Sequence, residues 1–208
     1  MSDPARPGGP NFENRDPNSP GFWDERFDQR FTPWDQAGVP DAFRDFVAAW
    51  PGDKPPNVLI PGCGSTYEAL DFAQRGWPVR VIDFSPSAVA SVQAQLRVHA
   101  SIVEQADFFG YKPPFAPDWI YERAFLCALP RNRRLDYVAQ MAHLLAPEAL
   151  LGGFFFIGAT PKKLPFGIDR PELDALLTPH FSLVDNREVS GSIPVFAGRE
   201  RWMTWRRT

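Results

Sequence analysis

Short apolar runs alternate with helix-like segments along most of the chain, and this alternation restricts the possible folds more than any other feature. Runs typical of buried strands are found at residues 57–60, 78–83, 101–107, 119–122 and 150–160. Segments with a helical spacing of apolar residues lie between them, at residues 65–76, 85–96 and 135–145. Such repeats favour a mainly parallel sheet that is covered by helices on both faces and joined by right-handed crossovers.

The C-terminal part of the chain departs from this alternation. Residues 181–189 and 202–206 are two strand-like runs, and the Gly- and Pro-containing loop between them leaves no room for a helix. Strands joined in this way pair antiparallel. The sequence therefore predicts an α/β fold, a three-layer αβα sandwich with a mostly parallel, seven-stranded sheet and an antiparallel C-terminal hairpin.

A length of 208 residues indicates a single domain. Residues 1–20 are rich in proline and glycine and have no hydrophobic period, so we expect a disordered N-terminal tail followed by one domain at residues 21–208. Aromatic side chains at helix-like spacing after residue 21 predict an aromatic lid or core helix, which ends near residues 32–33. A second helix at residues 41–50 completes this N-terminal segment.

Charge and hydropathy exclude several functional classes. A formal net charge of -3 argues against a surface that neutralises many phosphates, so no nucleic-acid partner is expected. The longest apolar run, at residues 150–157, is too short to span a membrane, and the polar N-terminus does not resemble a secretory signal. We expect a cytoplasmic monomer. Cys63 and Cys127 lack metal-ligand spacing, which indicates reduced structural thiols and no metal site.

The candidate ligand site follows from the ends of the predicted strands, because ligands of open parallel sheets bind beyond the carboxyl ends of the strands. After the first strand, Gly62 and Gly64 allow a tight turn and a close approach of the backbone to a ligand. After the second strand, about 20 residues further on, the carboxylate of Asp83 can accept hydrogen bonds from both hydroxyls of a ribose. Tyr67 replaces the third glycine of the dinucleotide pattern, which disfavours a pyrophosphate and favours adenosylmethionine.

Two further features lie close to this turn and to the third strand. Ser65 and Glu68 have the spacing of a capping box, which predicts that a helix starts there and that Glu68 reaches back to cap it. Asp107 can accept a hydrogen bond from the adenine amine, and Phe108 can pack on the adenine ring.

Three separated motifs resemble the thiopurine S-methyltransferase family, within the larger class of Rossmann-like methyltransferases. They are the aromatic segment at residues 22–35, the Pro-x-Cys-Gly turn at 58–64 and the acidic-Arg motif at 122–130. The segment at residues 162–166 lacks the family's Gly-Pro-Pro-Phe form. The resemblance implies a Rossmann-like fold and methyl transfer from S-adenosyl-L-methionine, with S-adenosyl-L-homocysteine as product, to a small-molecule nucleophile of the thiol, selenol or halide-like type.

Together, the strand ends and the resemblance assign the expected cofactor contacts to the lid, the glycine turn and the residues after the strands. These contacts are Phe27, Trp34, Gly62, Cys63, Gly64, Asp83, Phe84, Gln105, Ala106, Asp107, Phe108 and Arg123. Arg123 is the expected catalytic residue, because a cation near the acceptor favours a thiolate. Arg133 and Arg134 are second candidates for this role. A structural alternative is that Arg123 pairs with Glu122 or Asp107.

The expected chemistry is an in-line displacement, which requires positioning of the reactants rather than a covalent nucleophile or a metal. Two other functional classes stay open. A non-catalytic adenosylmethionine-binding module would carry the same Gly62, Asp83 and Arg123. An NAD-dependent oxidoreductase would use the same sheet but is disfavoured by Tyr67. The sequence leaves the identity of the methyl acceptor open.

Overall fold

A seven-stranded sheet forms the centre of the protein in this computed structural model, which describes residues 10–35, 37–50, 52–158, 164–192 and 194–208. The strands are β1 Val58–Pro61, β2 Val79–Asp83, β3 Val103–Gln105, β4 Trp119–Arg123, β5 Leu150–Phe156, β6 Phe181–Glu188 and β7 Glu200–Arg207. Their order across the sheet is β3-β2-β1-β4-β5-β7-β6. Strands β1 to β5 pair in parallel, whereas β7 pairs antiparallel with both β5 and β6. The predicted sheet and its antiparallel C-terminal pair are confirmed.

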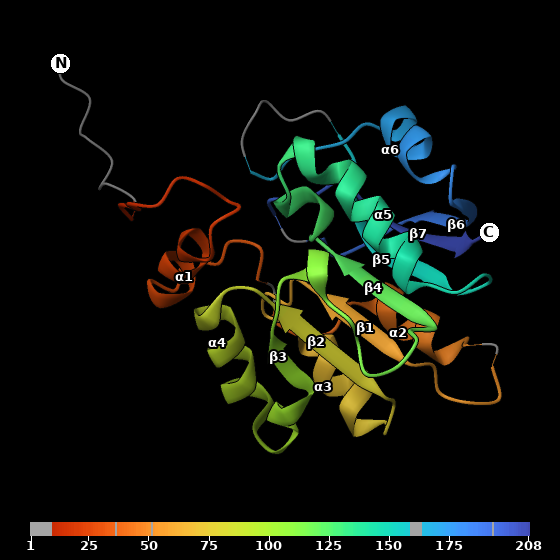
Figure 1. The fold of residues 1–208 in the computed structure, drawn as a ribbon, viewed down its shortest axis with the longest axis horizontal. Coiled ribbons are helices and arrows are strands. Elements are labelled where there is room, and N and C mark those ends of the chain that lie inside the picture. Colours follow the sequence, from red (N-terminus) through yellow and green to blue (C-terminus); the bar gives the residue numbers. More distant parts are fainter. Residues whose placement is uncertain (1–9, 36, 51, 159–163, 193) are drawn as a thin grey trace.

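Helices cover both faces of the sheet (Figure 1). The helices of the protein are α1 Pro20–Asp28, which packs against α4, and α2 Asp41–Ala48, α3 Tyr67–Gln74, α4 Pro86–Leu96, α5 Arg134–Leu144 and α6 Arg170–Leu177. Short 3-10 turns are η1 Arg97–Ile102, η2 Phe108–Gly110, η3 Leu126–Ala128 and η4 Arg131–Arg133. Successive residues of β1 enter opposite layers, as the pleat of a strand requires. Val58 packs in the core beneath α2, α3 and α4, and Leu59 packs in the core beneath α5 and α6. The predicted three-layer sandwich is thus confirmed.

The chain reverses direction across the sheet at β1. From β1 it continues through β2 to β3 on one side, and it then returns to add β4 and β5 on the other side. The carboxyl ends of the neighbouring strands β2, β1 and β4 therefore lie side by side at one edge of the sheet. In doubly wound sheets this switch point is where ligands bind.

The N-terminal helix is shorter than the aromatic spacing predicted. Helix α1 ends at Asp28, and Arg30 then adopts a left-handed backbone with φ 53°. This conformation redirects the chain, so that Phe31 and Trp34 follow the helix in a non-helical segment. The helix-like spacing of these aromatic residues therefore does not come from one continuous helix.

The folded part of the chain also begins earlier than residue 21. Phe12 is buried and packs against Phe31, with ring centroids 5.4 Å apart. The backbone N–H groups of Glu13 and Asn14 each donate to the carboxylate of Glu25 at 2.9 Å. The predicted tail boundary at residue 20 is therefore too late for residues 12–19, whereas residues 1–9 lie outside the described part of the chain.

Two local predictions are wrong. Helix α3 starts after Thr66 without a side-chain cap, because Glu68 turns into the protein interior instead of reaching back to Ser65. The strand predicted at residues 101–107 is confined to β3, because the residues before it continue the end of α4 as the 3-10 turn η1.

Within the described residues, no helix is long and apolar enough to cross a membrane.

Gly153 allows β4 and β5 to approach closely. Its backbone has φ 151°, and a Cβ atom at this position would lie 2.0 Å from the carbonyl oxygen of Glu122. A backbone oxygen in a central sheet cannot move aside as a flexible side chain can. The close contact holds the strand that carries Glu122 and Arg123 in its register.

We expect Gly153→Ala to lower the free energy of unfolding by at least about 3 kcal/mol, because the added methyl group overpacks the centre of the sheet. Gly76→Ala is the matched control, since Gly76 also has a positive φ but a Cβ there would meet open space. This control should lose only about 1 kcal/mol. Urea unfolding followed by circular dichroism measures both values, and equal losses would contradict the packing role of Gly153.

Candidate functional site

A cavity of about 780 Å³ lies at the carboxyl ends of the central strands. It is lined by the turn after β1 with Gly62 and Gly64, by Asp83 at the end of β2 and by Arg123 at the end of β4. Phe27 and Trp34 line it from the N-terminal segment. The other predicted cofactor contacts that line the cavity are Cys63, Phe84, Ala106, Asp107 and Phe108. The structure thus brings together eleven of the twelve predicted residues.

Gln105 is the exception. It ends the edge strand β3 with an exposed side chain, and its amide donates to the carbonyl oxygen of Phe84 at 3.5 Å. It is not among the described residues that line the cavity. The predicted contact of Gln105 with the cofactor therefore stays a prediction, and its absence from this lining does not support it.

The glycine turn presents bare backbone to the cavity. Gly62 and Gly64 adopt φ 61° and 50°, a backbone conformation that residues with a Cβ atom rarely take. A Cβ at Gly62 would lie 2.3 Å from the ring of Phe125. The backbone N–H of Cys63 donates to the carbonyl of Ile82 at 3.2 Å, which ties the turn to β2. The missing side chains leave backbone that a ligand can approach closely.

Asp83 is held beside this turn by backbone donors. The N–H of Ser85 donates to its Oδ1 atom at 2.9 Å, and Cys63 and Gly64 also hydrogen-bond to its carboxylate. Burial raises the pKa of Asp83 to about 6, while these hydrogen bonds act in the opposite direction. Burial and the neighbouring Asp83 raise the pKa of the Cys63 thiol, so this cysteine stays protonated at neutral pH. A carboxylate in this position can accept hydrogen bonds from ligand hydroxyls.

Asp107 serves first as a local cap. Its side chain accepts a hydrogen bond from the backbone N–H of Phe109 at 3.0 Å and so begins the turn η2. The same turn places Phe108 at the cavity, where its ring lies 5.2 Å from that of Phe125. This corner of the cavity is therefore a mainly aromatic surface with one carboxylate at its edge.

The lid segment is anchored to the helix that follows Asp83. Asp24 of α1 accepts hydrogen bonds from the hydroxyl of Ser85 at 2.6 Å and from the backbone N–H of Ser87 at 3.0 Å. These donors lie at the start of α4, where a negative charge is favourable. The anchor places Phe27 and Trp34 over the cavity, with ring centroids 6.0 Å apart.

Arg123 is paired with a residue that its sequence neighbours do not suggest. Its guanidinium forms an ion pair with Oε1 of Glu68, and the hydroxyl of Tyr121 donates to the same oxygen at 3.0 Å. Neither Glu122 nor Asp107 is its partner in this pair. Burial lowers the pKa of Arg123, whereas the nearby carboxylates of Glu200 and Asp35 raise it. Sequence analysis missed Glu68 as a site residue because its position fits a helix cap equally well.

Glu122 faces the opposite layer of the sheet. Its carboxylate accepts hydrogen bonds from the Tyr137 hydroxyl at 2.7 Å and from the backbone N–H groups of Phe125 and Leu126 at 2.8 and 3.0 Å. Burial raises the pKa of Glu122 to about 7, and these hydrogen bonds act to lower it. Glu122 therefore shapes the loop after β4 and has no place in the cavity itself.

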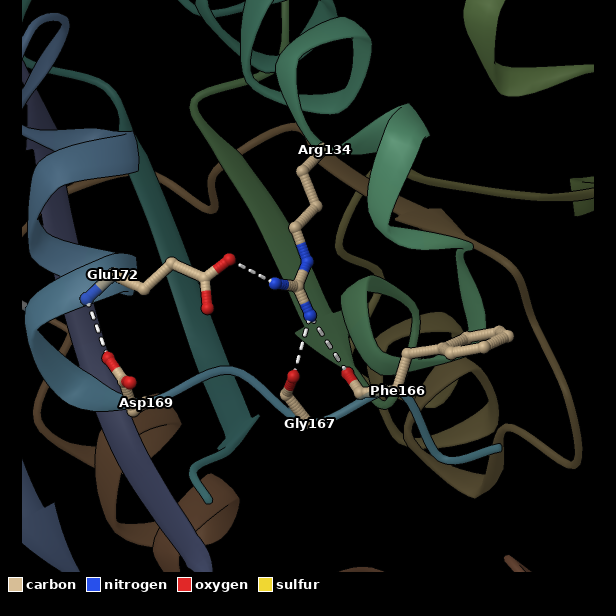
Figure 2. Close-up of polar contacts among 5 residues, drawn as sticks. All are labelled: Arg134, Phe166, Gly167, Asp169 and Glu172. Atoms are coloured by element: carbon tan, nitrogen blue, oxygen red, sulfur yellow. Dashed lines mark hydrogen bonds and ion pairs between the residues drawn. The ribbon is translucent and has the colours of Figure 1, made fainter. Parts of the chain in front are cut away.

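The two other candidate arginines have different positions. Arg133 lines the cavity, lies over the ring of Phe109 at 3.8 Å and pairs with Asp136 at 3.3 Å. Arg134 is buried away from it, and Figure 2 shows its guanidinium between Glu172 and the chain at residues 166–167.

Arg134 has a structural role. It donates to the carbonyl oxygens of Phe166 and Gly167 at 3.2 and 2.7 Å and forms an ion pair with Glu172. Asp169 accepts the backbone N–H of Glu172 at 2.9 Å and caps α6 (Figure 2). Arg134 thus joins α5 to the segment before α6, and the prediction that it contacts a substrate is not supported by its position.

Other residues that line the cavity were not among the predicted cofactor contacts. Glu200 opens β7, and burial raises the pKa of its carboxyl group, while Ser192 and Arg123 lower it. Leu164 and Pro165 also line the cavity, whereas Lys162 and Lys163 of the same predicted segment lie outside the described residues. Residues distant in sequence reach the cavity through the order of the strands, which a single sequence does not reveal.

Comparison with known proteins agrees with this geometry. The sequence pattern of the family described as thiopurine S-methyltransferase (TPMT) matches residues 18–208. Thiocyanate methyltransferase 1 of Arabidopsis thaliana is 26% identical over 200 residues, covering 90% of this chain and 85% of the relative. A thiopurine S-methyltransferase of Pseudomonas fluorescens (strain Pf0-1) is 26% identical over 179 residues, covering 76% of this chain and 81% of the relative.

A solved structure has the same fold. The 1,6-didemethyltoxoflavin-N1-methyltransferase of Burkholderia thailandensis, solved with 1,6-didemethyltoxoflavin and S-adenosylhomocysteine bound, superimposes with a TM-score of 0.70 at 22% identity, covering 90% of this chain and 85% of that chain. The family match extends from the lid helix α1 to the last residue of the chain and includes every strand of the sheet. The chain belongs to the thiopurine S-methyltransferase family.

Proposed function

We propose that this chain is an S-adenosylmethionine-dependent methyltransferase that acts on a small-molecule nucleophile of the thiol, selenol or halide-like type. The observation that carries the proposal is the shared cavity of the bare turn at Gly62 and Gly64, the carboxylate of Asp83 and the guanidinium of Arg123. Family membership and the thiocyanate, thiol and thiopurine methyltransferases among the relatives support it.

The residues of the cavity fit this cofactor. Bound adenosylmethionine would supply a methyl carbon that already carries a sulfonium leaving group. The glycine turn offers backbone without side chains, Asp83 offers an acceptor for ribose hydroxyls, and Phe108 offers an aromatic surface for adenine. Phe27 and Trp34 cover the cavity and limit the access of water.

The task of the protein in such a displacement is to hold two reactants in line. Arg123 lies at the end of β4, between the turn that would hold the cofactor and the loop after β4. Its cation would favour the thiolate form of an acceptor whose pKa is ordinarily about 8.5. Because Glu68 offsets part of this charge, Arg123 acts mainly at short range.

Two alternatives have distinct binding signatures. We expect isothermal titration calorimetry to detect binding of adenosylmethionine and adenosylhomocysteine and to detect no binding of NAD, because Tyr67 begins α3 where a pyrophosphate site needs glycine. Binding of NAD alone would indicate an oxidoreductase instead. Binding of adenosylmethionine without transfer of labelled methyl to a panel of thiols, selenols and halide ions would favour a non-catalytic module.

We expect Asp83→Ala to weaken adenosylhomocysteine binding by about 1.5–3 kcal/mol, the size of a lost charge-assisted hydrogen bond. Since the ionised carboxylate is the acceptor and its pKa is about 6, wild-type affinity should fall as the pH decreases through 6. Asp83→Asn keeps the shape of the side chain and should abolish this pH dependence. Calorimetry at pH 5 to 8 measures both effects, and a wild-type affinity that is constant over this range would remove Asp83 from the ribose site.

We expect Arg123→Ala to reduce the turnover number by at least about tenfold at saturating cofactor, because a positioned cation at the reacting atoms is lost. Arg75→Ala is the control, since Arg75 lies on the solvent side of α3 and pairs with Asp71. Its turnover number should equal that of the wild type. Steady-state methyl transfer measures both variants, and normal turnover of Arg123→Ala would exclude a catalytic role.

A further inference from the structure

Glu68 lines the cavity, and one of its two carboxylate oxygens has no hydrogen-bond partner among the described residues. The side chain is only 1% exposed, and its Oε1 atom accepts from both Tyr121 and Arg123. Its Oε2 atom is also buried and, among the residues that the structure describes, accepts no hydrogen bond. Glu68 lines the cavity from the first turn of α3, directly after the glycine turn.

An ionised oxygen in this position calls for a donor. A buried polar atom without a partner costs about 1–3 kcal/mol, and more where the group is charged. Arg123, the nearest cation, is already engaged at the other oxygen. Glu68 therefore keeps one acceptor oxygen free, in a side chain that lines the cavity beside the guanidinium of Arg123.

We propose that Oε2 of Glu68 accepts a hydrogen bond from the α-ammonium group of adenosylmethionine, so that Glu68 recognises the amino-acid end of the cofactor. This inference rests on the proposed function and assigns to Glu68 a binding role that the sequence motifs did not indicate. Asp83 lies on the β2 side of the glycine turn and Glu68 on the β4 side, so the two carboxylates suit opposite ends of one ligand.

An ammonium group fits better than the other donors that such a ligand offers. It carries a full positive charge and three N–H donors, whereas a sulfonium has no hydrogen to donate and a ribose hydroxyl is neutral. The neighbouring guanidinium of Arg123 matches an α-carboxylate. The Glu68 and Arg123 pair thus presents one negative and one positive partner side by side, as the zwitterionic end of an amino acid requires.

The decisive experiment compares three ligands on the wild-type protein by isothermal titration calorimetry. They are adenosylhomocysteine, its desamino analogue with hydrogen in place of the α-amine, and 5′-methylthioadenosine, which lacks the whole amino-acid end. The wild type should bind adenosylhomocysteine about tenfold or more tightly than the desamino analogue, since a charge-assisted hydrogen bond is lost. Equal affinities, within about twofold, would overturn the proposal without any need for a variant.

Glu68→Gln then tests the residue itself. Its amide oxygen can stay with Arg123, which leaves an NH₂ group facing the ligand amine. The tenfold preference for the amine should fall to within about threefold, and the affinity for 5′-methylthioadenosine should stay unchanged. Glu104→Gln is the matched control, because Glu104 also accepts a tyrosine hydroxyl, from Tyr111 at 2.9 Å, but lies outside the residues that line the cavity.

The remaining outcomes are separable. An equal loss of affinity for all three ligands in Glu68→Gln would make Glu68 a structural partner of Arg123 only and would overturn the proposal. A preference for the amine that persists in Glu68→Gln while the three affinities stay unchanged would assign the ammonium to another group and would also overturn the proposal. If the wild type binds neither adenosylhomocysteine nor 5′-methylthioadenosine, the proposed function fails first and the inference fails with it.

Discussion

The partly buried ion pair between Arg123 and Glu68 joins the two parts of the protein on which the cavity depends. Arg123 ends β4 and Glu68 lies in the first turn of α3, and these two residues are 55 positions apart in the chain. Removing two charges from water is costly, and the cost is offset only when further hydrogen bonds complete the pair. Tyr121, two residues before Arg123 on the same face of β4, supplies one of them. The other carboxylate oxygen of Glu68 accepts no hydrogen bond from the described residues, and in our proposal the cofactor ammonium supplies that bond.

Glu122, on the other face of β4, positions the loop after this strand, which lines the same cavity. Glu122 points away from Arg123 and accepts the backbone N–H of Phe125, which fixes the turn after the strand. The ring of Phe125 is thereby pressed against Gly62, where a Cβ would meet it at 2.3 Å. Glu122 and Arg123 are consecutive in the chain but act in opposite layers. Glu122 positions the loop after β4, and Arg123 faces the cavity. The need for glycine at position 62 follows from this packing as well as from its positive φ.

Local features of this structure are predictable from the sequence, whereas features that depend on partners distant in the chain are not. Strand periodicity was enough to place Gly62, Gly64 and Asp83 together, because parallel strands all end at one edge. Glu68 was assigned to a cap, because its true partner is 55 residues away. Gln105 was expected at the site from the family resemblance alone, which does not show that its side chain lies outside the cavity lining. The insertion of β7 between β5 and β6 brings Glu200 to the cavity, and no spacing within the chain indicates this order.

The loop between β2 and α4 couples the lid to the ribose side of the cavity. Ser85 donates its backbone N–H to Asp83 and its hydroxyl to Asp24, so one residue contacts both the predicted ribose acceptor and the lid helix. The hydroxyl of Ser85 also accepts the N–H of Ala88 at 3.1 Å and thereby caps α4. Because three hydrogen bonds meet at one buried serine, the position of the lid cannot change without disturbing the start of α4. Ser85 therefore holds both the aromatic lid and the carboxylate of Asp83 in place.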